Sequence, residues 1–148
     1  MHAAELVVPA PVVRLDDPVL TALQVLLDSG LPGLVVRDGD RHLVVPGSQV
    51  LRVALPRYVR DDPSLSRVWD EASADALVAQ VAGLTVADLM EALDLDEGSP
   101  TTMVGADATT IEVAAVMSAA HVPLVAVLDA GRFMGVVTVE ALVAHLVS

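Results

Sequence analysis

Apolar residues in the first third of the chain change from helix-like to strand-like spacing. Leucines recur at intervals of three and four between residues 20 and 27, which predicts an amphipathic helix. Asp17-Pro18 is typical of a helix start, with the carboxylate as cap, and Gly30 is typical of a helix end. Apolar runs at 34–36 and 43–45 flank a turn, so a β-hairpin is expected next. Ser48 is expected to cap a further helix that reaches about residue 55.

The centre of the chain has helical spacing. Asp62-Pro63 repeats the aspartate-proline start and opens a stretch whose apolar positions face one side until about Gly83. Thr85 and Asp88 have the spacing of a capping box, which predicts a short helix to about residue 93. An acidic loop is expected at 94–100.

The first pattern then returns. An extended segment is expected at 101–104, and Thr109 with Glu112 forms a second capping box in front of a helix. A buried strand at 124–128, a turn and a second strand follow, and Thr138 is expected to cap the last helix from about residue 139.

The two halves superimpose in one ungapped register with an offset of 91 residues. In this register the prolines, turn residues and helix starts coincide, as in Pro9 with Pro100, Asp16 with Asp107, Pro32 with Pro123, Arg41 with Arg132 and Leu51 with Leu142. Each unit is an extended segment, a helix, two strands and a helix, over about 50 residues, which is too small to be stable alone. The two sheets are therefore expected to bury a face against each other.

Three segments of the second unit resemble the tandem cystathionine-beta-synthase (CBS) domain pair, or Bateman module. They are Asp107-Ala-Thr-Thr-Ile-Glu-Val-Ala, His121-Val-Pro-Leu-Val-Ala-Val-Leu-Asp129 and Gly131-Arg-Phe-Met-Gly-Val-Val-Thr138. The first unit matches more loosely, through Asp17-Pro-Val-Leu-Thr-Ala-Leu, Leu31-Pro-Gly-Leu-Val-Val and Arg41-His-Leu-Val-Val. The resemblance covers about residues 3–55 and 86–147.

The resemblance implies an α+β fold in which two β-α-β-β-α CBS repeats pack sheet to sheet as a pseudo-two-fold pair. We expect CBS repeat 1 at 1–55, a helical linker at 56–85 and CBS repeat 2 at 86–148, together forming one Bateman module. Trp69, on the apolar stripe of the linker, is expected to pack on the dimer or inter-unit surface.

The resemblance also implies a function. It predicts a regulatory module, not an enzyme, that binds an adenosyl compound such as AMP, ADP, ATP or S-adenosylmethionine in clefts between the repeats. It further implies a homodimer that signals to a separate effector protein, with no required cofactor. For the repeat 2 cleft it indicates Thr102, Met103, Val104, His121, Val122, Pro123, Thr138 and Ala141. For the repeat 1 cleft it indicates Val12, Val13, Leu31, Pro32, Gly47 and Val50.

Two positions depart from the family pattern. The family carries Thr or Ser at the strand-to-helix corner and an Asp three residues later that holds the ribose. Here Thr138 is followed by Ala141, and the matching residues of the first unit are Gly47 and Val50. Glu140 is one position away and would point about 100° around the helix. Thr138 is therefore either a helix cap alone or also a ligand contact, and a CBS-fold interaction module that no longer binds nucleotide is the alternative function.

The net charge of the chain limits the kinds of partner that it can bind. The net charge is −12, which argues against binding nucleic acid. Residues 1–67 hold seven of the eight arginines and have a net charge of about −1, so any anion should prefer this half. Arg14, Arg37, Arg41 and Arg132 are candidate phosphate contacts, or else members of a solvated face paired with aspartates.

The remaining chemistry is sparse. There is no cysteine, and the histidines lack metal-ligand spacing, so we expect no metal. His121 could meet a ligand or bond to the backbone, and the acids from Asp88 to Glu97 read as a solvated helix end and loop. We find no catalytic motif, signal peptide or apolar run long enough to span a membrane, so a cytoplasmic protein without membrane insertion is expected.

Overall fold

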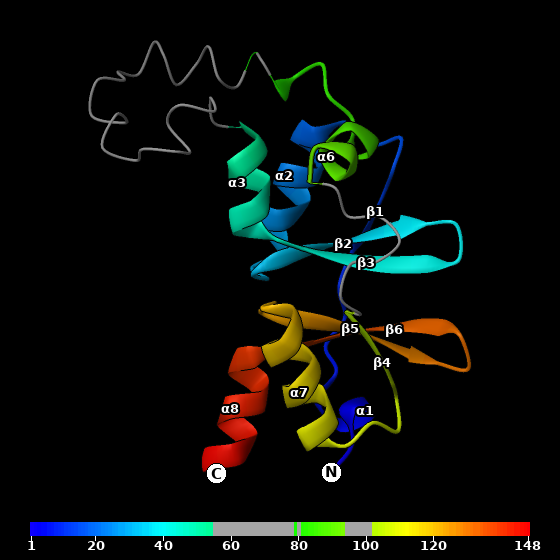
Figure 1. Ribbon diagram of the computed structural model, residues 1–148, viewed down its shortest axis with the longest axis vertical. Coiled ribbons are helices and arrows are strands. Elements are labelled where there is room, and N and C mark those ends of the chain that lie inside the picture. The colour runs from blue at the N-terminus through cyan, green and yellow to red at the C-terminus, as the bar shows by residue number, and fades with distance from the viewer. Residues whose placement is uncertain (55–78, 80, 94–101) are drawn as a thin grey trace.

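The computed structural model describes residues 1–54, 79, 81–93 and 102–148. They form two three-stranded sheets whose inner faces meet, with helices on the outer faces (Figure 1). The α+β class and the two repeats predicted from the sequence are confirmed. The predicted helix at 62–83, with Trp69, and the acidic loop at 94–100 lie almost wholly outside the described residues. The domain limits at 55 and 86 stay a prediction.

The first repeat has strand order β1-β2-β3. Strand β1 (Val12–Arg14) runs parallel to β2 (Gly33–Asp38), and β2 is antiparallel to β3 (Arg41–Pro46). Helix α2 (Val19–Ser29) connects β1 to β2, and α3 (Gly47–Ala54) follows β3. Parallel strands need a crossover connection, and α2 supplies it between β1 and β2. The third strand, β3, follows β2 in an antiparallel hairpin.

The second repeat has the same plan. Its strands are β4 (Met103–Gly105), β5 (Leu124–Asp129) and β6 (Arg132–Thr138), and its helices are α7 (Thr110–Ala120) and α8 (Val139–Val147). The capping box at Thr109 and Glu112 is present, as predicted. Asp17 differs from expectation, because no side chain caps α2 and the Asp17 carboxylate accepts the main-chain N–H of Arg14 at 2.8 Å instead. Helix α3 begins at Gly47, one residue before the predicted cap Ser48.

Each repeat is completed by a short helix that the chain supplies from in front of the other repeat. Helix α6 (Val86–Leu93) precedes β4 but packs on repeat 1, where Val86 and Leu89 are buried with Val36 and Val45. Helix α1 (Ala3–Leu6) precedes β1 but packs on repeat 2, where Ala3 is fully buried. Figure 1 shows α1 beside α7 and α6 beside α2. The two repeats therefore exchange their leading helices.

A β-bulge interrupts the repeat register. Val127 pairs with Gly135, but the next residue, Leu128, pairs with Phe133, so Met134 is the extra residue in β6. Repeat 1 has no such insertion, and Val35 pairs with Val44 where Ala126 pairs with Val136. The predicted ungapped register is therefore wrong after residue 133, where the offset becomes 92.

The sheets meet in a shared apolar cluster. Val35 and Val44 from repeat 1 pack with Leu124, Ala126 and Val136 from repeat 2, all nearly inaccessible to solvent. At one end of this cluster His42 stacks on Phe133, with ring centroids 4.8 Å apart and planes 7° from parallel. His42 and Phe133 are equivalent residues of the two repeats, so the stack lies across the pseudo-two-fold axis. The apolar faces predicted to need mutual burial thus form the inter-repeat core.

Candidate functional site

A cleft of about 430 Å³ opens where residues of both repeats meet. Repeat 1 contributes the residues at the end of α2, and repeat 2 contributes the strand–helix corner between β6 and α8. The segment in front of β1 closes one side. The lining residues are Val8, Gly30, Leu31, Pro32, Pro123, Thr138, Val139 and Glu140.

The corner at Thr138 is fixed by two hydrogen bonds. The Thr138 Oγ1 atom accepts the main-chain N–H of Ala141 at 3.1 Å, so Thr138 caps α8 as predicted. The Val139 N–H donates to the Pro123 carbonyl at 2.9 Å, which fixes the start of α8 to the start of β5. Because the cap uses only an oxygen lone pair, the hydroxyl hydrogen of Thr138 can still be donated to a ligand.

The acidic residue at this cleft is Glu140. The helical rotation of about 100° per residue predicts that the side chain of Glu140 points away from the direction of residue 141, and Glu140 is among the residues that line the cleft beside Thr138. Glu140 lies in the first turn of α8, where the unpaired N–H groups of the helix favour a carboxylate. An acidic residue therefore lies at the cleft although position 141 is alanine.

Val8 is held at the cleft by pairing with β6. Its N–H donates to the Val136 carbonyl at 2.8 Å, and the Val136 N–H donates to the Val8 carbonyl at 2.9 Å. Sequence reasoning missed Val8, Gly30, Val139 and Glu140 as site residues. The available signal was the proline-flanked extended segment at 7–11, which needs a partner strand.

Four of the predicted site residues, Leu31, Pro32, Pro123 and Thr138, meet at this cleft. The side chains of Val13 and Val50 are buried in the core of repeat 1, and those of Val104 and Val122 pack in the core of repeat 2. Val12 and Met103 belong to the inter-repeat cluster. Thr102 accepts the Val44 N–H at 3.4 Å, and His121 is the exposed left-handed residue that ends α7.

The bulge changes the counterpart of this site in repeat 1. Thr138 pairs with Leu124, and Pro46 pairs with the equivalent residue Gly33, so Pro46 is the structural match of Thr138. The match of Ala141 is then Gln49. Gly47 and Val50, assigned from the ungapped register, are each displaced by one residue. Repeat 1 therefore has proline and glutamine at the positions where repeat 2 has Thr138 and Ala141.

The candidate arginines do not line the cleft. Arg41 pairs with Asp38 at 2.6 Å, and Arg132 is exposed on the other hairpin. Arg14 and Arg37 line a different hollow, of about 640 Å³, at the far end of β1 and β2. Within the described ranges no group of three metal-ligating side chains is close enough to hold an ion. Among the same residues, no helix is long and apolar enough to cross a membrane.

Comparison with known proteins identifies the family to which the chain belongs. The family model for the CBS domain matches residues 98–148. A crystal structure of a CBS domain-containing protein of unknown function from Kribbella flavida is 38% identical, with a TM-score of 0.77, over 100% of this chain and 99% of that one. The chain belongs to the CBS domain family. The predicted resemblance to a tandem CBS pair is thereby confirmed.

More distant CBS pairs share the fold. CBSX2 from Arabidopsis thaliana is 21% identical, with a TM-score of 0.69, over 99% of this chain and 94% of that one. A structure of CBSX2 in complex with AMP is 20% identical, with a TM-score of 0.64, over 99% of this chain and 96% of that one. No curated protein matches the sequence.

Proposed function

We propose that this CBS pair is a regulatory ligand-sensing module that binds an adenosyl compound in the cleft at Thr138 and signals to a separate partner protein. One observation carries the proposal: both repeats line the same cleft, so a ligand there contacts Leu31 and Pro32 from one repeat and Thr138 from the other. The AMP complex of CBSX2 supports it, because that protein has the same fold.

The chemistry of the cleft suggests how such a ligand is held. Leu31, Pro32 and Pro123 present apolar surface to a purine base. The hydroxyl of Thr138 and the carboxylate of Glu140 would bind ribose hydroxyls, and a hydrogen bond to a charged group contributes about 1.5–3 kcal/mol. Glu140 thus takes the role that Ala141 cannot.

Electrostatics ranks the adenosyl candidates. Glu140 repels a phosphate chain in the same cleft, and the net charge of −12 adds to this repulsion. The sulfonium of S-adenosylmethionine is attracted instead. We therefore expect S-adenosylmethionine and AMP to bind more tightly than ADP and ATP.

Signalling would follow from differential affinity. A ligand that touches both repeats favours the arrangement in which its contacts are complete, and a partner that binds one arrangement better responds to occupancy. No chemical step is involved, so the module acts by binding and not as an enzyme.

Thermal unfolding with added ligand tests the proposal. AMP, ADP, ATP, NADH and S-adenosylmethionine are titrated separately. At ten times Kd a ligand stabilises the protein by about 1.4 kcal/mol, which gives a concentration-dependent rise in Tm. Val139→Trp should fill the cleft and abolish the rise. Ile111→Trp is the matched control, because Ile111 is exposed near the start of α7, away from the cleft.

The alternative is an interaction module that no longer binds nucleotide. It is favoured if none of the five compounds shifts Tm at millimolar concentration. Helix α8 supports a protein contact, because Val143, Leu146 and Val147 are exposed and lie at helical spacing. We infer that this face forms a homodimer, and Leu146→Glu should then yield a monomer in light scattering.

A further inference from the structure

The hollow at the far end of β1 and β2 contains an unusual pair of like charges. Arg14 and Arg37 are register partners on the parallel strands β1 and β2, and His42 is the partner of Arg37 on β3. Partners in register project to the same face of a sheet. Two residues earlier on this face, Val12 and Val35 belong to the inter-repeat cluster, so the arginines lie at its edge.

The structure does little to neutralise these guanidinium groups. Arg14 Nε lies 3.4 Å from Asp16 Oδ1, but both side chains are about three-quarters exposed, so the pair contributes little. Asp17 bonds to the main chain of Arg14 and not to its guanidinium. Among the described residues, no carboxylate lies within ion-pair distance of Arg37.

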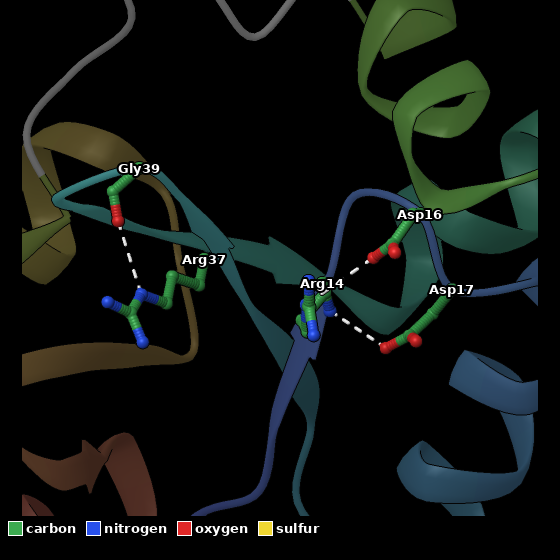
Figure 2. A network of polar contacts seen from close by, with 5 residues as sticks. All are labelled: Arg14, Asp16, Asp17, Arg37 and Gly39. Carbon is green, nitrogen blue, oxygen red and sulfur yellow. Dashed lines mark hydrogen bonds and ion pairs between the residues drawn. The ribbon is translucent and has the colours of Figure 1, made fainter.

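Arg37 is nevertheless held in place. Its Nε donates to the Gly39 carbonyl at 3.2 Å, and Figure 2 shows the two terminal nitrogens pointing away from that bond. Like charges directly opposite one another destabilise a sheet. Among the described residues, Asp16 is the carboxylate within ion-pair distance of this pair, and its contact with Arg14 is exposed and weak, so an added anion would stabilise the pair.

We propose that Arg14 and Arg37 bind the phosphate of a small phosphomonoester in this hollow, at a site separate from the Thr138 cleft. Guanidinium forks bind tetrahedral oxyanions through paired hydrogen bonds. The volume of about 640 Å³ fits a small molecule, and Val12 and Leu15 give its apolar part a surface. Asp16 also lines the hollow, and the net charge of −12 opposes anion binding anywhere on the protein, so phosphate binding here depends on the two guanidinium groups.

The hollow at Arg14 and Arg37 lies away from the Thr138 cleft, and different experiments test the two sites. Leu31 of the cleft and Arg37 are six residues apart along β2 and its lead-in, or about 20 Å in an extended chain. Val139→Trp, which fills the cleft, should therefore leave phosphate binding unchanged. Failure of the adenosyl proposal would not remove this site, and loss of this site would not affect that proposal.

Calorimetric titration of the full chain with phenyl phosphate and with inorganic phosphate tests the inference. Phenyl phosphate should bind more tightly, because Val12 and Leu15 contact its ring. Arg14→Gln and Arg37→Gln should each weaken binding by about tenfold or more. Arg41→Gln is the control, because Arg41 pairs with Asp38 and does not line the hollow. It should retain the wild-type affinity.

A folding measurement separates a binding role from a structural one. Each Gln variant removes a like-charge repulsion together with one exposed contact, the Arg14–Asp16 ion pair or the Arg37–Gly39 hydrogen bond, so its Tm should stay close to that of the wild type. Loss of binding with an unchanged or higher Tm supports the site. The inference is overturned by the absence of saturable binding at millimolar ligand, by equal affinity for inorganic and phenyl phosphate, or by an equal loss in Arg41→Gln.

Discussion

Gly135 allows the N-terminal segment to pair with the second repeat, and replacing it with alanine should release that segment. Gly135 has a φ of +151°, and a Cβ built there would overlap the carbonyl oxygen of Val8. That oxygen is main chain and cannot move without loss of both hydrogen bonds between Val8 and Val136. Two such bonds contribute about 1 kcal/mol each, and the strained backbone adds about 1–3 kcal/mol. We therefore expect Gly135→Ala to destabilise the protein by about 3–5 kcal/mol.

Gly131→Ala is the matched control for this prediction. Gly131 also has a positive φ, of +80°, but nothing lies within 4 Å of its added Cβ. Its replacement should cost only the conformational penalty of about 1 kcal/mol. Urea unfolding followed by circular dichroism measures both variants, and hydrogen exchange at the amides of Ala3, Ala4 and Val8 reports release of the segment. Equal destabilisation in the two variants, or retained protection of these amides in Gly135→Ala, would refute the reasoning.

Three further substitutions test other parts of the structure. Burial, followed by the charge of Arg37, lowers the pKa of His42, so the folded protein disfavours its protonated form. The wild type should therefore lose stability as the pH falls below about 6.5, by at most about 1.4 kcal/mol per pH unit, and His42→Phe should lack this component in urea unfolding at pH 7.5 and 5.5. Thr138→Ala should cost about 1 kcal/mol of unfolding free energy and Thr138→Ser should restore it; an equal loss in both would contradict the capping role. Gly33→Ala should lower Tm, because the added Cβ would lie 2.7 Å from the Val45 carbonyl oxygen and 2.8 Å from the Leu124 side chain. An unchanged Tm would show that the repeats can move apart at this point without loss of stability.

Local signals in the sequence predicted most of the elements correctly. The leucine spacing before Gly30, the capping box at Thr109 and the turn at 38–40 each correspond to the expected element. These signals act within a few residues, where propensity and capping decide the structure. The repeat itself was also visible, because prolines and turn residues recur at a fixed offset.

Two features that depend on distant contacts, the β-bulge and the position of Glu140, were not predicted. The bulge at Met134 is stabilised by pairing between β5 and β6 and by the close approach of Val8 to Gly135. A sign of it was present in the Val-Val doublets, which lie 92 residues apart, at 44–45 and 136–137, and not 91. The position of Glu140 at the cleft follows from how α8 meets β5, through the bond from Val139 to Pro123. Four of the predicted cleft residues meet there, since they lie at the ends of correctly predicted elements.

The exchange of α1 and α6 has a consequence for synthesis of the chain. Helix α1 leaves the ribosome before either repeat, yet the surface that buries Ala3 is formed by repeat 2, which is made after repeat 1. Repeat 1 must likewise wait for α6 before Val86 and Leu89 can complete its core. Because domains generally fold from the N-terminus as they emerge, this arrangement delays completion of repeat 1 until α6 is made and burial of α1 until repeat 2 is made. A nascent chain stalled between the repeats would therefore expose the apolar faces of both α1 and the first sheet.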